Sequence, residues 1–185
     1  MSKRRSDGSL TGGTGDVNPQ LLSFGGLQSD NDLTTTFKIN LPVTRIPQGN
    51  KVTILEVLKV YWFMDEVSLV ATTQIPYRSI TAMLSTSNHG TVPSEFSQAD
   101  VFASSNYTMV MFYSVNGAYA TNQIKTQVTD LTDGAGHGIL LGTDACWLQI
   151  ISYATTKQNS VQGKLLYRFK TVGVTEYVGI VQSQQ

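Results

Sequence analysis

The sequence predicts an all-β fold, a single antiparallel sandwich of about eight strands in one domain. Three observations indicate this. Only 14% of the 185 residues are charged, well below the roughly 25% typical of soluble domains. Val, Ile, Thr and aromatic residues, which suit pleated surfaces, fill segments with a period of two. Turns rich in Gly, Asn and Pro separate these segments, with no regular helical stretches between them. An all-helical bundle is excluded, and a parallel α/β sheet is disfavoured.

The first predicted strand begins at Thr34. Its apolar residues Phe37, Ile39, Leu41 and Val43 alternate with polar ones, and Pro42 and Pro47 close the strand. Residues 51–64 predict a long buried strand, because their β-branched and aromatic content outweighs a possible helix. Its apolar residues occupy both faces, with Val52, Ile54, Leu58, Val60, Trp62 and Met64 on one face and Leu55, Val57, Tyr61 and Phe63 on the other. The second face needs cover from an arm, a loop or a neighbouring subunit.

Six further strands are expected at 76–85, 107–115, 123–129, 146–155, 164–172 and 174–181, with one short helix near 94–103. Residues 1–33 are rich in Gly, Ser, Asp, Asn and Gln, which is typical of a flexible arm that contributes little to a core. The predicted domain organisation is therefore a polar N-terminal arm over 1–33 and a β domain over 34–185. No secretion signal and no membrane span is recognisable in the sequence.

The sequence contains few groups that could catalyse a reaction. Cys146 has no disulfide partner, and its apolar surroundings favour a buried, inert thiol over a reactive pair with His137. His137 and His89 both fall in loops without metal-ligand spacing. The Gly-rich segment 11–16 lacks the ending of a phosphate-binding loop. We therefore expect no enzyme activity, no cofactor and no metal site.

Two groups of basic residues are candidates for binding nucleic acid. Lys3, Arg4 and Arg5 lie near the start of the predicted arm, where basic side chains can contact phosphates independently of base sequence. Lys164, Arg168 and Lys170 have even spacing in a predicted strand, which places all three on one face. That face is either simply solvated or binds nucleic acid or another acidic partner, and the sequence leaves both interpretations open.

The two ends of the chain carry a resemblance to a known family. The N-terminal pieces MSKRRSDG and TGGTGDVNPQ and the C-terminal pieces LYRFK and EYVGIVQSQQ resemble capsid proteins of small circular, Rep-encoding single-stranded DNA viruses. In the middle of the chain the similarity is one of architecture. The resemblance implies a single jelly roll of two four-stranded sheets and self-assembly into an icosahedral shell, with about 60 copies in the smallest shell. It also implies a location in the virion and a circular single-stranded DNA genome contacted by the N-terminal arm.

The chain departs from this family pattern in its charge. Such capsids often have an arginine-rich arm, whereas this arm has three basic residues and the whole chain has a formal net charge of zero. Sixty arms would supply on the order of 180 positive charges against a thousand or more phosphates. Small cations, the face of Lys164, Arg168 and Lys170, or stacking of bases on aromatic side chains would have to contribute as well.

A different class of function is a carbohydrate-binding β-sandwich of the tail-fibre or lectin type. Its candidate aromatic residues are Trp62, Trp147, Tyr113, Tyr119 and Tyr153. Both tryptophans fall within apolar strands, where core packing is their expected role. A hydrolase would need an acid pair assembled from scattered residues. The partners expected from the sequence are other copies of the chain and single-stranded DNA, with no membrane and no identifiable receptor.

Overall fold

The structure is a computed structural model that describes residues 18–43, 49–64, 77–92, 95, 97–113, 119–125, 127–155 and 157–184. The described residues form ten strands and one helix: β1 (Gln20–Leu27), β2 (Thr35–Asn40), β3 (Lys51–Met64), β4 (Tyr77–Ser85), β5 (Val101–Tyr113), β6 (Tyr119–Lys125), β7 (Val128–Asp130), β8 (Ile139–Leu141), β9 (Ala145–Tyr153), β10 (Ser160–Gly173) and α1 (Val174–Ser183).

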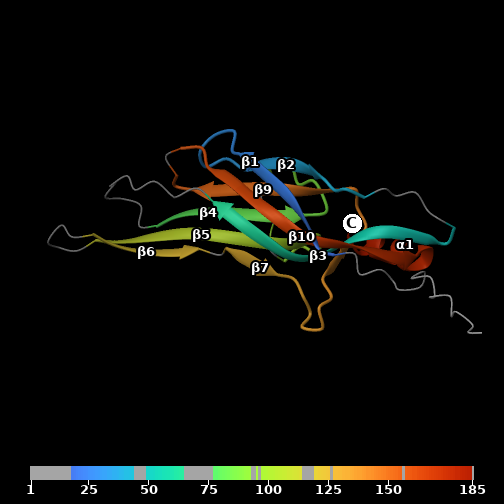
Figure 1. The fold of residues 1–185 in the computed structure, drawn as a ribbon. Coiled ribbons are helices and arrows are strands. Elements are labelled where there is room, and N and C mark those ends of the chain that lie inside the picture. The colour runs from blue at the N-terminus through green and yellow to red at the C-terminus, as the bar shows by residue number, and fades with distance from the viewer. Residues whose placement is uncertain are drawn as a thin grey trace, which may run out of the picture.

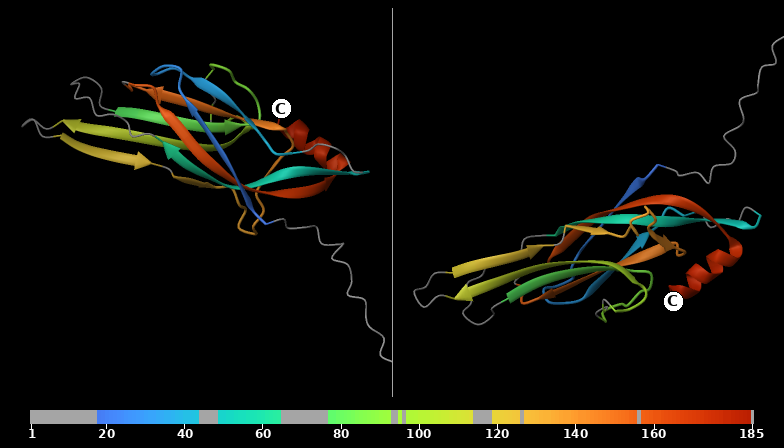
Figure 2. Two further views of the ribbon diagram at one scale, coloured as in Figure 1. Left: turned by 45° about the horizontal axis from the view of Figure 1, so that its top comes forward. Right: turned by 90° about the horizontal axis from the view of Figure 1, so that it is seen from below.

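The strands form two antiparallel sheets that lie face to face as two layers (Figures 1 and 2). The first sheet has the order β1-β10-β3, with β7 and β8 both pairing with the free edge of β3, and the second has the order β2-β9-β4-β5-β6. Pairing is nested, because β1 pairs with β10, β2 with β9, and β4 with β5. A long hairpin rolled up in this way is a jelly roll. The predicted fold class is confirmed, and each sheet has one strand more than the four that the resemblance implied.

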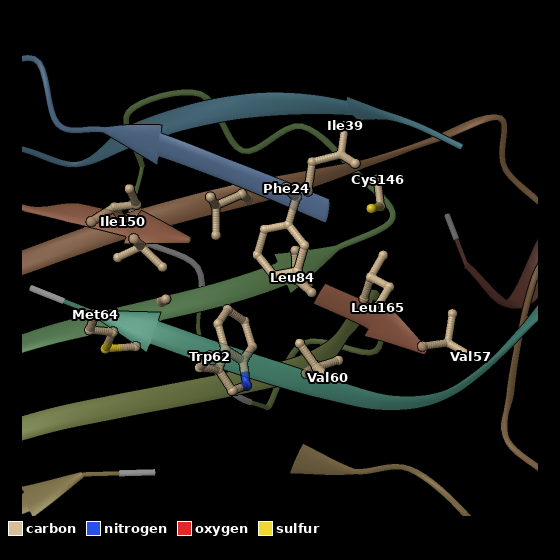
Figure 3. Close-up of a cluster of buried hydrophobic side chains, with 14 of the residues drawn as sticks. Phe24, Ile39, Val57, Val60, Trp62, Met64, Leu84, Cys146, Ile150 and Leu165 are labelled. Atoms are coloured by element: carbon tan, nitrogen blue, oxygen red, sulfur yellow. The ribbon is translucent and has the colours of Figure 1, made fainter. Parts of the chain in front are cut away.

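The core lies between the two layers and includes a strand from the segment predicted as an arm (Figure 3). Within residues 1–33, the stretch 20–27 forms β1, and its Phe24 ring meets the Trp62 ring edge-on at a centroid distance of 5.7 Å. Phe24 fits because Gly163 lies beside it on β10; a Cβ on Gly163 would come within 2.2 Å of the Phe24 ring. Phe24, together with the half-buried Leu22, thus anchors β1 to the sandwich.

The C-terminal segment is a helix, so the predicted strand at 174–181 is wrong. α1 turns back from the end of the β3–β10 ribbon and packs Tyr177 and Ile180 against Val52, Ile54 and Val172 (Figure 2). The apolar residues of this segment recur at helical spacings of three and four, but many of them are β-branched, which favours a strand. The tertiary contact decides between helix and strand.

Gly142 lets this helix approach closely, because a Cβ there would lie 2.8 Å from the Val181 side chain.

The predicted helix near 94–103 is also wrong in its described part. Residues 97–100 form turns, and β5 begins at Val101. The β5 residue Ala103 pairs with Leu84 and is buried in the core. No helix among the described residues has the length and apolar character of a membrane span.

Candidate nucleic-acid interface

A β-bulge at Leu58 determines which side chains of β3 face outward. Val57 pairs with Tyr167 and Lys59 with Leu166, so that Leu58 is an extra residue without a partner on β10. The alternation of faces therefore shifts by one residue at this point. Leu55, Val57, Val60, Trp62 and Met64 belong to the main core, whereas Ile54 belongs to the smaller cluster under α1. The faces assigned to residues 52–58 from strict alternation are thus partly wrong, since a bulge leaves no clear mark in the sequence.

The predicted basic residues of β10 occupy alternate positions, as the spacing required, but their environments differ. Lys164 is exposed, and Lys170 is half-buried. Arg168 is held by Glu56, with its Nε 2.6 Å from the carboxylate Oε2, and its Nη2 donates to the Gly136 carbonyl. Arg168 therefore stabilises the fold, and Lys164 is the most accessible cation of the three. Lys3, Arg4 and Arg5 lie outside the described residues.

Glu56 is an ionised carboxylate with a side chain only 1% exposed. Besides Arg168 it accepts a hydrogen bond from the Gly138 backbone N–H at 2.9 Å. Burial raises the pKa of Glu56, but the hydrogen bonds from Arg168 and Gly138 and the charges of Arg168 and Lys170 outweigh it, so that the net pKa is lowered. Glu56 and Arg168 thus connect the loop before β8 to the sheet, through hydrogen bonds with Gly138 and Gly136.

Lys59 and Asp130 form a second ion pair on the outer face, between β3 and β7. Their Nζ and Oδ2 atoms are 2.8 Å apart, and the two side chains are 37% and 51% exposed. The hydrogen bond from Lys59, followed by those from Thr132, lowers the pKa of Asp130 to about 2. Lys59 thus already has a carboxylate partner, whereas none of the described carboxylates pairs with Lys164.

The same outer face also carries apolar side chains in solvent. Phe63 on β3 is 56% exposed, and Val128 on the adjacent β7 and Leu21 and Leu27 on the edge strand β1 are exposed as well. A pocket of about 180 Å³ lies here, lined by Tyr61, Trp62, Phe63, Gln127 and Val128. Sequence reasoning placed Tyr61 and Phe63 on a surplus apolar face, but did not identify them as site residues. The detectable signal was two aromatic residues at i and i+2 in the most apolar strand.

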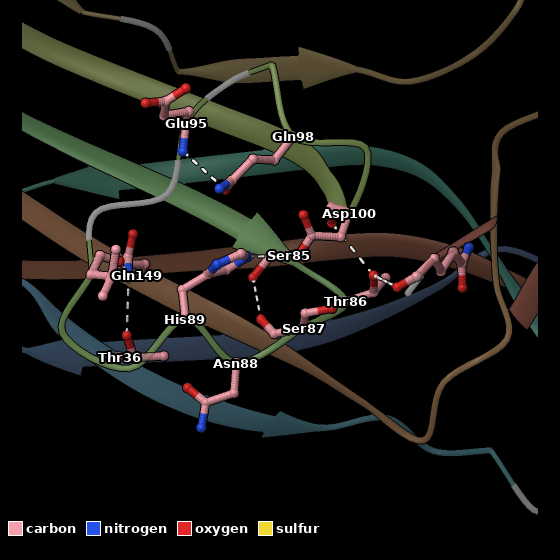
Figure 4. Close-up of polar contacts among 12 residues, drawn as sticks. Thr36, Ser85, Thr86, Ser87, Asn88, His89, Glu95, Gln98, Asp100 and Gln149 are labelled. Carbon is pink, nitrogen blue, oxygen red and sulfur yellow. Dashed lines mark hydrogen bonds and ion pairs between the residues drawn. The ribbon is translucent and has the colours of Figure 1, made fainter. Parts of the chain in front are cut away.

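The cysteine and the two histidines considered from the sequence as candidate reactive or metal-binding groups each have an environment that the structure describes. Cys146 is buried in the core, and burial raises the pKa of its thiol to about 12, which disfavours a thiolate. His89 contacts Asp100 at 2.6 Å, in a loop that also binds the end of α1 through a hydrogen bond from Thr86 to the Gln184 carbonyl (Figure 4). His137 lies 3.8 Å from Glu56. Within the described part of the chain, no group of three or more His, Cys, Asp or Glu residues could hold a metal ion.

The aromatic candidates for carbohydrate binding are also separated by the structure. Trp62 is 1% exposed in the core, and its Nε1 donates to Thr129. Trp147 is half-buried with the Lys38 ammonium above its ring at 5.9 Å from the ring centroid. Tyr153 is 50% exposed. The side chains of Tyr113 and Tyr119 lie outside the described residues.

No protein-family model matches the sequence, and no curated protein matches it. Solved structures with a similar arrangement include VP1 of Trichodysplasia spinulosa-associated polyomavirus in complex with 3'-sialyllactose, with 11% identity, a TM-score of 0.49, and coverage of 85% of this chain and 97% of that one. VP1 of Merkel cell polyomavirus in complex with GD1a oligosaccharide has 9% identity and a TM-score of 0.47, with coverage of 85% and 97%.

Apo VP1 of New Jersey polyomavirus has 8% identity and a TM-score of 0.46, with coverage of 84% of this chain and 99% of that one. At these identities and scores the likeness concerns general architecture, and the jelly roll itself follows from the strand order of this chain.

Proposed function

We propose that this chain is a viral capsid protein that self-assembles into an icosahedral shell. The observation that carries the proposal is the exposed apolar surface of α1. This helix has ten residues and none of them is buried in the single chain. Val174 and Val178, one helical turn apart, are 40% and 46% exposed. Isolated helices shorter than about 12 residues are marginal in water, so that a neighbouring copy would both cover and stabilise α1.

Other parts of the chain offer further surface for contacts between copies. Leu33, Val92 and Tyr153 are exposed large apolar side chains outside the outer face of the first sheet. Exposed apolar positions at several places on one chain suit a subunit with several neighbours, as in a closed shell. The jelly roll itself supports this function by analogy of fold alone.

The proposed cargo is nucleic acid, and the resemblance of the chain ends favours a circular single-stranded DNA genome. Lys3, Arg4 and Arg5 on the N-terminal arm and Lys164 on β10 would contact phosphates. Arg168 supports the sheet through Glu56 instead. Because the chain has zero formal net charge, small cations and base stacking would supplement these contacts, and the protein would reside in the virion.

The test is to express the full chain, purify it, and examine it by gel filtration and negative-stain electron microscopy. Closed particles of uniform, virus-like diameter are the expected result, and nuclease-resistant nucleic acid inside them would identify the cargo. A species that remains monomeric at high protein concentration would contradict the proposal.

Carbohydrate binding is a second candidate, favoured by the exposed ring of Tyr153. Aromatic rings in solvent are common sites for stacking against sugars, whereas Trp62 is unavailable in the core. A glycan array with the wild type and with Tyr153→Ala measures this directly. A signal that disappears in the variant supports glycan binding, and a signal equal in both proteins excludes Tyr153 as the site.

A further inference from the structure

We propose that the outer face of the first sheet binds single-stranded nucleic acid, with a base in the pocket at Tyr61 and Phe63 and a phosphate at Lys164. This inference rests on the proposed function, since it names the surface of the capsid protein that faces the genome. It concerns a site independent of the N-terminal arm.

The register of the strands places these groups together. Lys164 on β10 lies directly opposite Tyr61 on β3, and Gln162 lies opposite Phe63. Directly opposite residues on one face of an antiparallel pair have Cβ atoms about 5 Å apart. Val128 on β7 is opposite Tyr61 on the other side. The sheet thus presents a row of cation, aromatic ring and apolar side chain across three strands.

The pocket offers what an unpaired base needs. Tyr61, Phe63 and Val128 give the pocket an apolar and aromatic lining, and Gln127, whose side chain carries an amide, also lines it. Stacking on an aromatic side chain tolerates any base and contributes about 1–3 kcal/mol per base. An amide can donate to and accept from the edge of a base. Bases inside a duplex are already stacked, so that the pocket selects a single strand.

The charges of the face favour an anionic partner. Outward positions of β3, β7 and β10 carry four basic and two acidic residues, namely Lys59, Lys164, Arg168, Lys170, Glu56 and Asp130. Both carboxylates are already paired, Asp130 with Lys59 and Glu56 with Arg168. Among the described residues, no carboxylate lies within ion-pair distance of the Lys164 ammonium.

A second copy of the chain would have to bring a carboxylate to Lys164 and an apolar group to the pocket at the same place. A single nucleotide brings an anion and an aromatic ring at a fixed separation. The combination of an exposed cation, which no described carboxylate pairs with, and an adjoining aromatic pocket therefore fits a nucleotide strand better than a protein surface.

The experiment measures binding of a fluorescein-labelled 20-nucleotide dT strand to the unassembled full chain by anisotropy, with a 20-base-pair duplex for comparison. Phe63→Ala should weaken dT binding about tenfold because a stacking surface is lost. Lys164→Glu should weaken it about tenfold or more and reduce its salt dependence. Tyr61→Phe keeps the ring and should bind like the wild type, whereas Tyr61→Ala should not.

Two matched controls separate the site from general effects. Lys157→Glu changes an exposed lysine in the loop before β10, and Leu27→Ala removes an exposed apolar side chain beyond the pocket. Both should change dT binding less than twofold. An equal loss for Lys157→Glu and Lys164→Glu, or a duplex bound as tightly as dT, would overturn the proposed site. Thermal unfolding of each variant shows that the fold is retained.

Electron microscopy of the same variants distinguishes a failure of the nucleic-acid site from a failure of the capsid proposal. Phe63→Ala and Lys164→Glu should still form particles, with less nucleic acid measured by the ratio of absorbance at 260 and 280 nm. Variants that lose particles but keep dT binding would show that this face is a contact between subunits, which overturns the inference and leaves the capsid proposal intact. A wild type that forms no particles yet binds dT through these residues would overturn the capsid proposal instead.

Discussion

Glu56 shows how a single charged residue can be kept within an apolar strand. It lies on the outer side of β3, yet the loop before β8 and Arg168 cover it almost completely. A buried carboxylate is costly unless its oxygens are satisfied, and here one oxygen meets a guanidinium and the other a backbone N–H.

We expect Glu56→Gln to destabilise the fold by about 3 kcal/mol, because Arg168 would remain without its counter-charge. The pKa of Glu56 in the folded chain is lower than its ordinary value of 4.5. Its contribution to stability is therefore present above pH 4.5 and is lost as the pH falls through the lower folded pKa.

Thermal unfolding between pH 3 and pH 7 measures this effect. The difference in unfolding temperature between the wild type and Glu56→Gln should become smaller as the pH is lowered. Asp130 and Asp133 also have lowered pKa values, but both are present in the two proteins and cancel in the comparison. The exposed Glu176→Gln serves as the control. A gap independent of pH would contradict the assigned role of the carboxylate.

At the scale of elements, α1 is attached to the sandwich by a small apolar cluster and by hydrogen bonds at its end. Tyr177 and Ile180 touch the small cluster at the end of β3 and β10. The Gln184 side chain accepts a hydrogen bond from the Gly142 N–H and donates to the Leu140 carbonyl. Val174 and Val178, on the part of the helix surface next to these contacts, are 40% and 46% exposed.

We expect the double substitution Val174→Glu and Val178→Glu to abolish particle formation while the subunit stays folded. Charges on a surface that another copy covers would be buried without partners. Analytical ultracentrifugation measures assembly, and circular dichroism monitors the fold. Glu176→Gln on the same helix should assemble normally. Particles formed by the double variant would show that α1 is not an assembly surface.

At the scale of the whole molecule, the described contacts of the sandwich begin near Gln20. Its side chain accepts a hydrogen bond from the Tyr167 hydroxyl, and β1 then pairs with β10 along its full length. Residues 1–17 carry the basic residues Lys3, Arg4 and Arg5. Because residues 1–17 are polar and rich in Gly and contain few apolar residues, we expect the fold not to depend on them.

We expect removal of residues 1–17 to leave the unfolding temperature unchanged and to lower the slope of log affinity against log salt for dT binding by about 2. Removal of residues 1–28 is the comparison. It deletes β1 together with Phe24, opens the edge of β10, and should destabilise the sandwich strongly. An unchanged salt slope after removal of residues 1–17 would contradict the role of the three basic residues.

The sequence by itself determined the all-β class, the positions of most long strands and the alternate spacing of Lys164, Arg168 and Lys170. These depend on local propensity and on a period of two, which neighbouring residues express directly. The family and the single-stranded DNA cargo remain predictions from the two ends of the chain.

Tertiary structure alone decided the remaining features. The bulge at Leu58 redirected the side chains of β3, Gly163 admitted Phe24 and so made β1 part of the core, and Val52, Ile54 and Val172 turned a β-branched segment into α1. Arg168 is ion-paired because Glu56, distant in sequence, lies opposite it on β3. The physical reason is common to all four cases: long-range contacts override local preference, and a sequence read one segment at a time does not contain them.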